Sequence, residues 1–339
     1  MDGGTRLEQF TGCLIGLAVG DALGYPAEFR SREQILRNIG PDGITDFLDI
    51  KDPRFDRPFI LGPDLPPGTY TDDTQMSIAL ARGLLDATGH DLDEQMNAVA
   101  THFVAWSISP DNNRSPGGTC MTGCDNLRRG VPWRTAGVAN SKGCGSAMRV
   151  APIGLLYVDD LDAVERVARA SSLLTHGHPA ALAGAAAAAL MVALAARGAG
   201  PELMYREIIR RCGGESPDFD SCFADLPGLV EKPPEEVLIE RQRGGLGEAW
   251  VAEEAAVSAL YCYWRHPDDY RAAVLAAVNT DGDSDSIAAI TGSVLGARLG
   301  LSGIPAPWVR DVEDSEPLQD LARALWQRRL EHRTTTARA

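Results

Sequence analysis

The sequence contains 339 residues, 44% of them hydrophobic and 23% charged, which is the composition of an ordinary soluble globular protein. Its formal net charge of -15 at pH 7 excludes the basic surface that a protein needs for non-specific binding to nucleic acid or anionic membranes. We therefore expect neither nucleic acid nor a membrane as a partner, and an anionic substrate would need cations or backbone donors to bind.

The first predicted element is a helix near the amino terminus. Apolar residues from Leu7 to Val19 recur at the spacing of one buried helical face. Gly24 is well placed to end this helix, because glycine commonly closes a helix and Pro26 follows just beyond it.

Helical patterns continue along the rest of the chain, whereas alternating β-branched runs bounded by turns are nearly absent. The apolar segment 146–157 fits either a helix or a strand. The remaining predicted helices cover residues 71–89, 96–106, 161–174, 179–196, 250–264, 270–278, 287–299 and 318–330. We therefore expect an all-α protein in which the loops between helices carry the polar chemistry.

We predict a single domain over residues 1–330. Residues 40–68, 109–120 and 212–247 have the composition of loops. The last of these is predicted to be an insertion rather than a domain boundary, because two acidic clusters lie on opposite sides of it and would need to meet in one site. Residues 331–339 are predicted to form a flexible tail.

The cysteines and the longest apolar stretch bear on cellular location. The seven cysteines are odd in number and lack the spacing of a zinc site, so we expect reduced thiols. The amino terminus lacks the basic region of a signal peptide. Residues 179–196 are uncharged but mostly alanine, which predicts a helix packed inside the protein rather than a membrane span. We expect a cytoplasmic monomer.

An acidic cluster, Asp281-Gly282-Asp283-Ser284-Asp285-Ser286, precedes the helix predicted at 287–299. Asp and Ser are common helix N-caps, so no single residue of this cluster requires a metal. Three carboxylates this close repel one another unless a cation offsets the repulsion, which favours oxygen ligands for a hard cation. Ser286 and Gly292 occupy the sixth and twelfth positions, where an EF-hand needs glycine and glutamate, so an EF-hand is excluded.

Another acidic cluster, Thr71-Asp72-Asp73-Thr74-Gln75, raises the same question. Because it comes earlier in the chain, we call it the first acidic cluster and the one at 281–286 the second. Asp72 with Gln75 three residues later fits a variant of the capping box, which explains one carboxylate but explains Asp73 less well. Together the clusters supply carboxylate and hydroxyl oxygens without an obvious histidine or cysteine set. That chemistry suits Mg²⁺ or Mn²⁺ rather than zinc or copper, and a pair of such ions could hold a substrate and a nucleophilic water.

Three further motifs are candidates for binding or catalysis. The glycine-rich segment 143–146 could present backbone N–H groups to a phosphate, with an ordinary loop as the alternative. Arg149, just after it, could pair with a carboxylate. His176 could hydrogen-bond a substrate, although histidines in this setting are more often caps or core residues. Glu28 lies between apolar residues, as a surface or ion-pairing residue often does.

Five motifs follow one another along the chain, namely Gly16-Leu17-Ala18-Val19-Gly20-Asp21-Ala22-Leu23-Gly24, Thr71-Asp72-Asp73-Thr74, Gly143-Cys144-Gly145-Ser146-Ala147-Met148-Arg149, Thr175-His176-Gly177-His178-Pro179 and Gly282-Asp283-Ser284-Asp285-Ser286. As a group and in this order they resemble the motifs of the ADP-ribosylglycohydrolases, which include the dinitrogenase reductase-activating glycohydrolase and the ADP-ribosyl-acceptor hydrolases. The resemblance covers most of the chain.

The resemblance implies a compact multi-helix domain that binds two Mg²⁺ or Mn²⁺ ions in a central cleft and hydrolyses an ADP-ribosyl linkage. By position, the implied metal ligands are Thr71, Asp72, Asp73, Asp283, Asp285 and Ser286. The implied catalytic residues are Glu28, Asp73 and Asp285. The implied substrate-binding residues are Gly143, Cys144, Gly145, Ser146 and His176. The partner would be an ADP-ribosylated protein or a small molecule that contains ADP-ribose.

The chain departs from the family pattern at several positions. Many relatives carry threonine at the positions of Ser284 and Ser286, and the Asp-Ser-Asp-Ser form resembles the arginine-specific branch. Residues 115–119 read Ser-Pro-Gly-Gly-Thr where several members carry Asp-Ile-Gly-x-Thr, so this loop supplies no aspartate as an acid–base partner. Cys144 stands where asparagine is frequent. Because the Asp-Ser-Asp-Ser form resembles that of the arginine-specific branch, we expect cleavage of the N-glycosidic bond to arginine.

Other functions remain open from the sequence alone. The same metals could serve a serine-, nucleic-acid- or O-acyl-linked ADP-ribose. A non-catalytic member of the family would bind ADP-ribose without cleaving it. A metal-dependent phosphoesterase would release AMP instead of free ADP-ribose.

Overall fold

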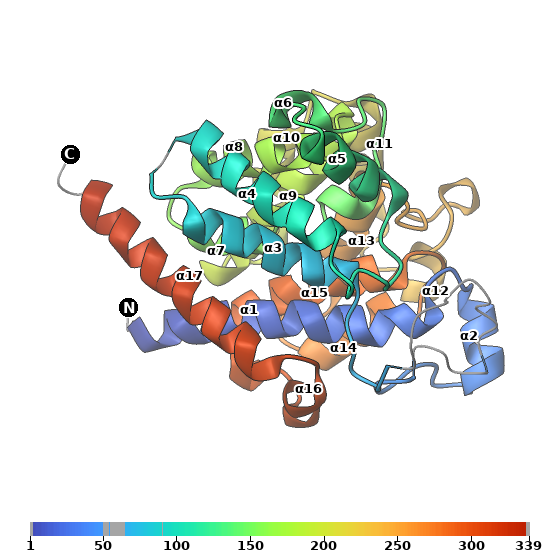
Figure 1. Ribbon diagram of the computed structural model, residues 1–339. Coiled ribbons are helices and arrows are strands. Elements are labelled where there is room, and N and C mark those ends of the chain that lie inside the picture. Colours follow the sequence, from blue (N-terminus) through green and yellow to red (C-terminus); the bar gives the residue numbers. More distant parts are fainter. Residues whose placement is uncertain (1–2, 50–53, 55–64, 90, 337–339) are drawn as a thin grey trace.

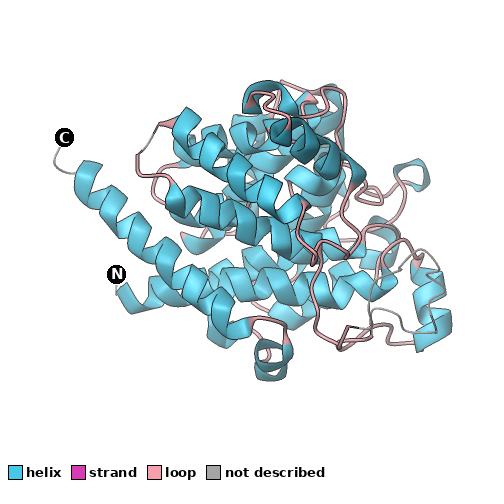
Figure 2. Cartoon of the chain, viewed as in Figure 1, coloured by secondary structure: helices cyan, strands magenta, loops and turns pink. Residues whose placement is uncertain are grey.

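The computed structural model describes residues 3–49, 54, 65–89 and 91–336. Within these residues every regular element is a helix, accompanied by isolated β-bridges, which confirms the predicted all-α class (Figure 1). Figure 2 shows the loops between these helices. The longer helices are α1 (Gly3–Gly24), α3 (Asp72–Asp86), α4 (Leu92–Ser107), α8 (Leu161–Leu173), α9 (Pro179–Ala196), α10 (Pro201–Cys212), α13 (Ala252–Arg265), α14 (Tyr270–Val278), α15 (Ser284–Leu299) and α17 (Ser315–Thr336).

Shorter helices join these elements. They are α2 (Arg32–Ile39), α5 (Gly118–Arg128), α6 (Trp133–Ala136), α7 (Ala151–Leu156), α11 (Pro217–Asp225), α12 (Pro234–Val237) and α16 (Ala306–Asp311), with 3₁₀ turns η1 (Tyr25–Ala27), η2 (Cys144–Ser146), η3 (Leu226–Gly228), η4 (Arg241–Arg243) and η5 (Leu301–Gly303).

Helices α1 and α15 pack with their backbones almost touching. Helix α1 carries glycine at four positions spaced four residues apart, namely Gly12, Gly16, Gly20 and Gly24. Residues four apart lie on one side of a helix, so these glycines form a single flat stripe. A Cβ atom added at Gly12 would lie only 2.5 Å from the carbonyl oxygen of Gly296 in α15. Only glycine therefore permits this contact.

The packing of α1 on α15 brings the carboxyl end of the first helix to the amino end of the second. A Cβ atom added at Gly24 would lie 2.5 Å from the Cα atom of Asp285. The hydroxyl of Ser284 donates a hydrogen bond to the carbonyl oxygen of Gly24 at 2.9 Å. The second acidic cluster is thus attached directly to the first predicted helix.

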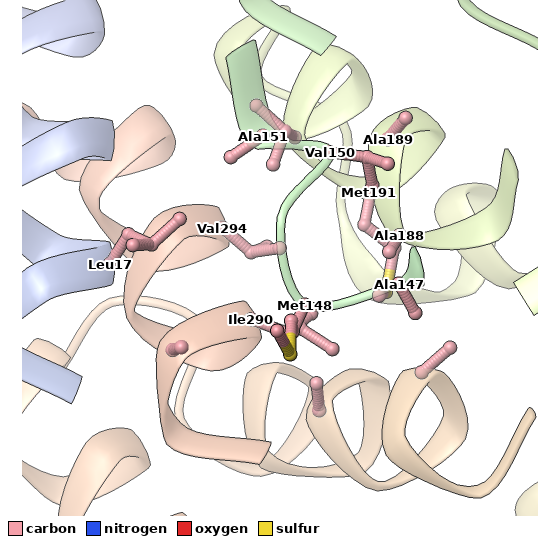
Figure 3. Packing of buried hydrophobic residues seen from close by; sticks show 14 of the residues in the cluster. Leu17, Ala147, Met148, Val150, Ala151, Ala188, Ala189, Met191, Ile290 and Val294 are labelled. Atoms are coloured by element: carbon pink, nitrogen blue, oxygen red, sulfur yellow. The ribbon is translucent and has the colours of Figure 1, made fainter. Parts of the chain in front are cut away.

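Helix α9 lies at the centre of the core. Its sequence is apolar on all sides, as expected for a helix surrounded by protein, and alanine lets its neighbours α7, α8, α13 and α15 approach closely. Figure 3 shows side chains of α9 and α15 on two sides of the segment 147–151. Two segments, Leu7–Ala27 and Pro179–Ala196, are long and apolar enough for a membrane span, but both are largely buried in the protein.

Some segments differ from the predicted elements. The ambiguous segment 146–157 forms the end of η2 and helix α7. The predicted insertion 212–247 contains short helices, of which α11 packs against α9 and α13. Helix α17 extends into the predicted tail as far as Thr336. Most of the stretch 50–64, in the first predicted loop, lies outside the described residues. The single domain stays a prediction.

Candidate active site

The two acidic clusters lie at the amino ends of two helices that border one cavity. Thr71 precedes α3, and Asp72 and Asp73 form its first turn. Asp283 is the N-cap of α15, and Asp285 lies in its first turn. The cavity has a volume of about 200 Å³, and its lining includes these four aspartates. The fold therefore unites the clusters that are far apart in the sequence.

The carboxylates around this cavity are buried and repel one another. Burial raises the pKa values of Asp72 and Asp73 well above those of ordinary aspartates, and neighbouring carboxylates raise them further. Burial also raises the pKa of Asp285, together with repulsion from Glu28 and Asp283. Among the described residues, none hydrogen-bonds to the buried Oδ1 atom of Asp73. Such a group of acids is costly in a folded protein unless a cation or protons neutralise it.

Glu28 joins the second cluster. Carboxylate oxygens of Glu28, Asp283 and Asp285 lie within 4.8 Å of one another, a spacing that could hold a metal ion. The segment that carries Glu28 is held by the loop of the second cluster, because the backbone N–H of Phe29 donates to the carbonyl oxygen of Gly282 at 2.8 Å. Phe29 itself has a φ of 65°, in the left-handed region that residues other than glycine seldom adopt.

The donor atoms in the cavity fit a hard divalent cation. Carboxylate and hydroxyl oxygens are the ligands that Mg²⁺ and Mn²⁺ prefer. Cys144 contributes a sulfur atom 2.9 Å from Oδ2 of Asp283, but burial raises the pKa of this thiol, so it is a neutral donor rather than a thiolate ligand. The unpartnered oxygen of Asp73 and the repulsion among the acids both agree with a bound cation.

Asp21, in α1, binds the first acidic cluster through hydrogen bonds. Its carboxylate accepts hydrogen bonds from the backbone N–H groups and hydroxyls of Thr71 and Thr74. Burial raises the pKa of Asp21 to about 6, although these four hydrogen bonds favour the ionised form. In the sequence Asp21 appeared only as part of a motif and had no assigned role. A lone aspartate within the apolar pattern of α1 was the signal for it.

Two of the predicted site residues do not line the cavity. The hydroxyl of Thr71 is turned toward Asp21, to which it donates at 2.8 Å. Ser146 is fully buried behind the cavity wall. By contrast, Ser286 lines the cavity, and its Oγ atom lies 3.7 Å from the sulfur of Cys144.

The predicted substrate loop forms one wall of the cavity through Gly143, Cys144 and Gly145. The segment before α13 supports this loop, because the N–H of Cys144 donates to the carbonyl oxygen of Trp250 at 3.2 Å. His176 also lines the cavity. Burial, followed by the charge of nearby Arg149, lowers the pKa of His176 to about 3, so its imidazole is neutral near pH 7.

An aromatic pair that no sequence pattern indicated lies where the cavity meets solvent. Phe29 and Trp250 stack with ring centroids 4.9 Å apart and planes inclined by 17°. Both rings line the cavity, and both residues are exposed, by 37% and 45%. The 115–119 loop also reaches the site, where the N–H of Gly117 donates to Oδ2 of Asp72 at 3.2 Å.

A larger cavity of about 440 Å³ lies beside α3 and α4. Its lining includes Arg114 and Glu313, which form an ion pair with each other. None of the predicted site residues contributes to this lining. The smaller cavity is therefore the better candidate for the active site, because both acidic clusters converge on it.

Comparisons with known proteins identify the family to which the chain belongs. A family model described as ADP-ribosylglycohydrolase matches residues 2–335. An uncharacterized protein of Archaeoglobus fulgidus is 36% identical over 94% of this chain and 96% of its own length. The ADP-ribosylarginine hydrolase Tri1 of Pseudomonas putida is 27% identical over 95% of this chain and 79% of its own. The human ADP-ribosylhydrolase ARH3 is 28% identical over 94% and 93% of the two chains.

A solved structure titled an ADP-ribosylglycohydrolase-related protein complex superposes with a TM-score of 0.74 and 27% sequence identity, covering 96% of this chain and 99% of that chain. The family model spans nearly the whole sequence, including all five motifs. The chain therefore belongs to the ADP-ribosylglycohydrolase family, which confirms the predicted family and the predicted class of enzyme.

Proposed function

We propose that this chain removes ADP-ribose from an ADP-ribosylated acceptor, with cleavage of the N-glycosidic bond to arginine, and that two Mg²⁺ or Mn²⁺ ions support the reaction. The observation that carries the proposal is the convergence of Asp72, Asp73, Asp283 and Asp285 on one cavity. The raised pKa values of buried acids there fit a site that gains stability from divalent cations.

Six residues would hold the ions: Asp72, Asp73, Asp283, Asp285 and Ser286 from the cavity lining, and Thr71 through a lone pair of the hydroxyl oxygen whose proton it donates to Asp21. Bound there, such ions supply Lewis acidity toward hydroxyl oxygens and lower the pKa of water. Glu28 borders the same cavity and would accept a proton from the water that attacks the anomeric carbon, or return one to the departing acceptor. Asp73 and Asp285 are the other carboxylates we assign to catalysis.

The chain's neutral groups would bind the ADP-ribose itself. The loop formed by Gly143, Cys144 and Gly145 borders the cavity and would approach the substrate with its backbone. His176 lies on the same lining and would contribute a side-chain hydrogen bond. Ser146, which is fully buried, would support the loop from behind.

The aromatic pair supports arginine as the acceptor. A guanidinium group stacks favourably on the face of an exposed indole, and Trp250 presents such a face beside acidic groups. A relative of this chain bears the name ADP-ribosylarginine hydrolase. The alternative substrates are serine-, nucleic-acid- and O-acyl-linked ADP-ribose. The alternative to an enzyme is a family member that binds ADP-ribose without turnover.

The proposal also includes a cytoplasmic location and a monomeric state. All seven cysteines are unpaired thiols, six of them buried, which suits a reducing compartment. The net charge of -15 makes anionic membranes and nucleic acid poor partners. Fractionation of cells and light scattering of the purified chain test these two points directly.

The decisive experiment measures release of free ADP-ribose from arginine-, serine-, O-acetyl- and DNA-linked substrates in the presence of Mg²⁺. We expect turnover of the arginine-linked substrate and its loss in the Asp72→Ala/Asp285→Ala double variant. Asp268→Ala, which removes a largely exposed carboxylate paired with Arg298, is the matched control. Unchanged release of ADP-ribose by the double variant would contradict the proposed mechanism. AMP as the product would identify a phosphoesterase instead.

A further inference from the structure

We propose that Arg149 and Thr175 are positioning residues that hold His176 as the neutral tautomer with its proton on Nε2, so that the ring donates a hydrogen bond to an oxygen of the ligand. The identity of that ligand, an ADP-ribosyl group, rests on the proposed function. The tautomer does not, because it is a property of the free protein.

Arg149 is fully buried, and no described carboxylate hydrogen-bonds to it. Its guanidinium lies over the ring of Phe103, 4.6 Å from the centroid. Nη1 donates to the carbonyl oxygen of Gly145 at 2.9 Å, and Nη2 donates to the carbonyl oxygen of Ser171 at 3.0 Å and to Oγ1 of Thr175 at 2.8 Å. Since a guanidinium cannot accept a hydrogen bond, Thr175 must be the acceptor in the last of these contacts.

The hydroxyl of Thr175 also carries a proton of its own, which needs an acceptor. Its other partner is Nδ1 of His176, at 2.8 Å, and no other described group accepts from it. If Nδ1 carried the imidazole proton, Oγ1 would accept twice and its own proton would be buried without an acceptor, because Thr175 is fully buried. Donation from Thr175 to Nδ1 gives both the buried hydroxyl proton and Nδ1 a partner. The imidazole proton is then on Nε2.

The charge of Arg149 strengthens this arrangement in two ways. A cation that binds the hydroxyl oxygen polarises its O–H bond and makes Thr175 a better donor. Burial, together with the same charge, opposes a second proton on the ring and lowers the pKa of His176 to about 3. The ring is therefore held in one tautomer and one charge state.

The Nε2 edge of His176 faces the substrate loop and the cavity. A Cβ atom added at Gly143 would lie 3.2 Å from Nε2, and one added at Gly145 would lie 3.0 Å from Cε1. Glycine at both positions thus leaves room along this edge of the ring. No described residue hydrogen-bonds to Nε2, so its N–H is available to a ligand. One guanidinium fixes both the ring and, through Gly145, the loop beside it.

The substitutions Thr175→Val and Thr175→Ser form a matched pair for testing the proposal. Valine keeps the shape of threonine but removes the hydroxyl, whereas serine keeps the hydroxyl. In the Mg²⁺-loaded full chain with ¹⁵N-labelled histidine, we expect a protonated Nε2 and an unprotonated Nδ1 for His176, with His176→Gln used to assign the signals. Thr175→Ser should give the same pattern, and Thr175→Val should lose it.

Calorimetry with ADP-ribose gives the second measurement. We expect binding to weaken by about tenfold in Thr175→Val and to stay near the wild-type value in Thr175→Ser, since a hydrogen bond to a charged ligand oxygen is of that order. A protonated Nδ1 in the wild type overturns the proposal, as does a Thr175→Val protein with the wild-type tautomer and affinity. If that variant does not fold, the wild-type spectrum decides. Absent turnover with the Nε2 tautomer present would contradict the proposed function only.

Discussion

The carboxylate of Asp21 in α1 accepts hydrogen bonds from both the backbone N–H and the hydroxyl of Thr71, at 3.0 and 2.8 Å. It accepts two more from Thr74, at 3.0 Å from the N–H and 2.6 Å from the hydroxyl. Asp21 therefore caps α3 although it belongs to another helix. The orientation of the first acidic cluster depends on α1 for this reason.

We predict that Asp21→Ala destabilises the protein by about 2 to 4 kcal/mol, because buried donors of Thr71 and Thr74 lose their acceptor. Urea denaturation at pH 8, where Asp21 is ionised, measures the loss. Asp91→Ala is the matched control, since Asp91 caps its own helix α4 by accepting from the N–H of Glu94, and such a cap contributes about 1 kcal/mol. Equal losses in the two variants would contradict the role assigned to Asp21.

Gly20→Ala should destabilise the protein by about 3 kcal/mol or more. In an exposed helix this substitution stabilises by roughly 1 kcal/mol, but here the added methyl would meet the backbone carbonyl of Ala288. Thermal or urea unfolding measures the sign of the change. Gly200→Ala is the control, because a Cβ atom at Gly200 meets nothing within 4 Å. A neutral or stabilising Gly20→Ala would show that α1 and α15 are not in backbone contact.

Without divalent cations, stability should fall as the pH rises above about 4. The unfolded chain releases aspartate protons near that pH, whereas burial raises the pKa values of Asp72, Asp73 and Asp285 in the folded state. The folded protein then binds more protons than the unfolded chain, so linkage lowers its stability with increasing pH. Asp21, with its pKa raised to about 6, contributes in the same direction between about pH 4 and 6.

Mg²⁺ should therefore raise the melting temperature more at pH 8 than at pH 5.5, because it competes with fewer protons at the higher pH. Melting curves with EDTA and with Mg²⁺ at both pH values provide the measurement. The Asp72→Ala/Asp285→Ala variant, as control, should show little Mg²⁺ effect at either pH. An equal Mg²⁺ effect at both pH values would mean that these carboxylates are not the ligands.

Trp250→Ala should raise KM for an arginine-linked substrate by about tenfold, with a smaller effect on kcat, because a guanidinium loses the aromatic face on which it stacks. Trp250→Phe keeps an aromatic face and should stay within about threefold of wild type. Steady-state kinetics on both variants, with a serine-linked substrate for comparison, give the result. An equal increase in KM for both linkages would show that Trp250 does not recognise the arginine.

Much of the site could be predicted because its residues are polar groups at fixed spacing within apolar patterns. Asp72, Asp73, Asp283 and Asp285 are such groups, and all four line the cavity. The all-α fold class could be predicted because apolar residues recur at helical spacing along most of the chain. The loop residue Gly143 needed the family resemblance, since a glycine-rich turn is common in proteins of every function.

The residues that were missed act through contacts that no local pattern records. Asp21 caps a helix from a distance of fifty residues along the chain, and Trp250 meets Phe29 only in the folded state. Helix α10 was not predicted, although its buried Met204, Ile208 and Cys212 recur at every fourth position.

The glycine stripe of α1 also determines how the two halves of the site can move relative to each other. Contacts between backbones that interlock at every fourth residue do not slide continuously, because the next equivalent register lies four residues away, about 6 Å along the helix. Ser284, bound to the carbonyl oxygen of Gly24, marks the register that the fold selects. The acidic clusters should thus be either fully in place or far apart, and cation affinity should vanish in one step with unfolding rather than decline gradually.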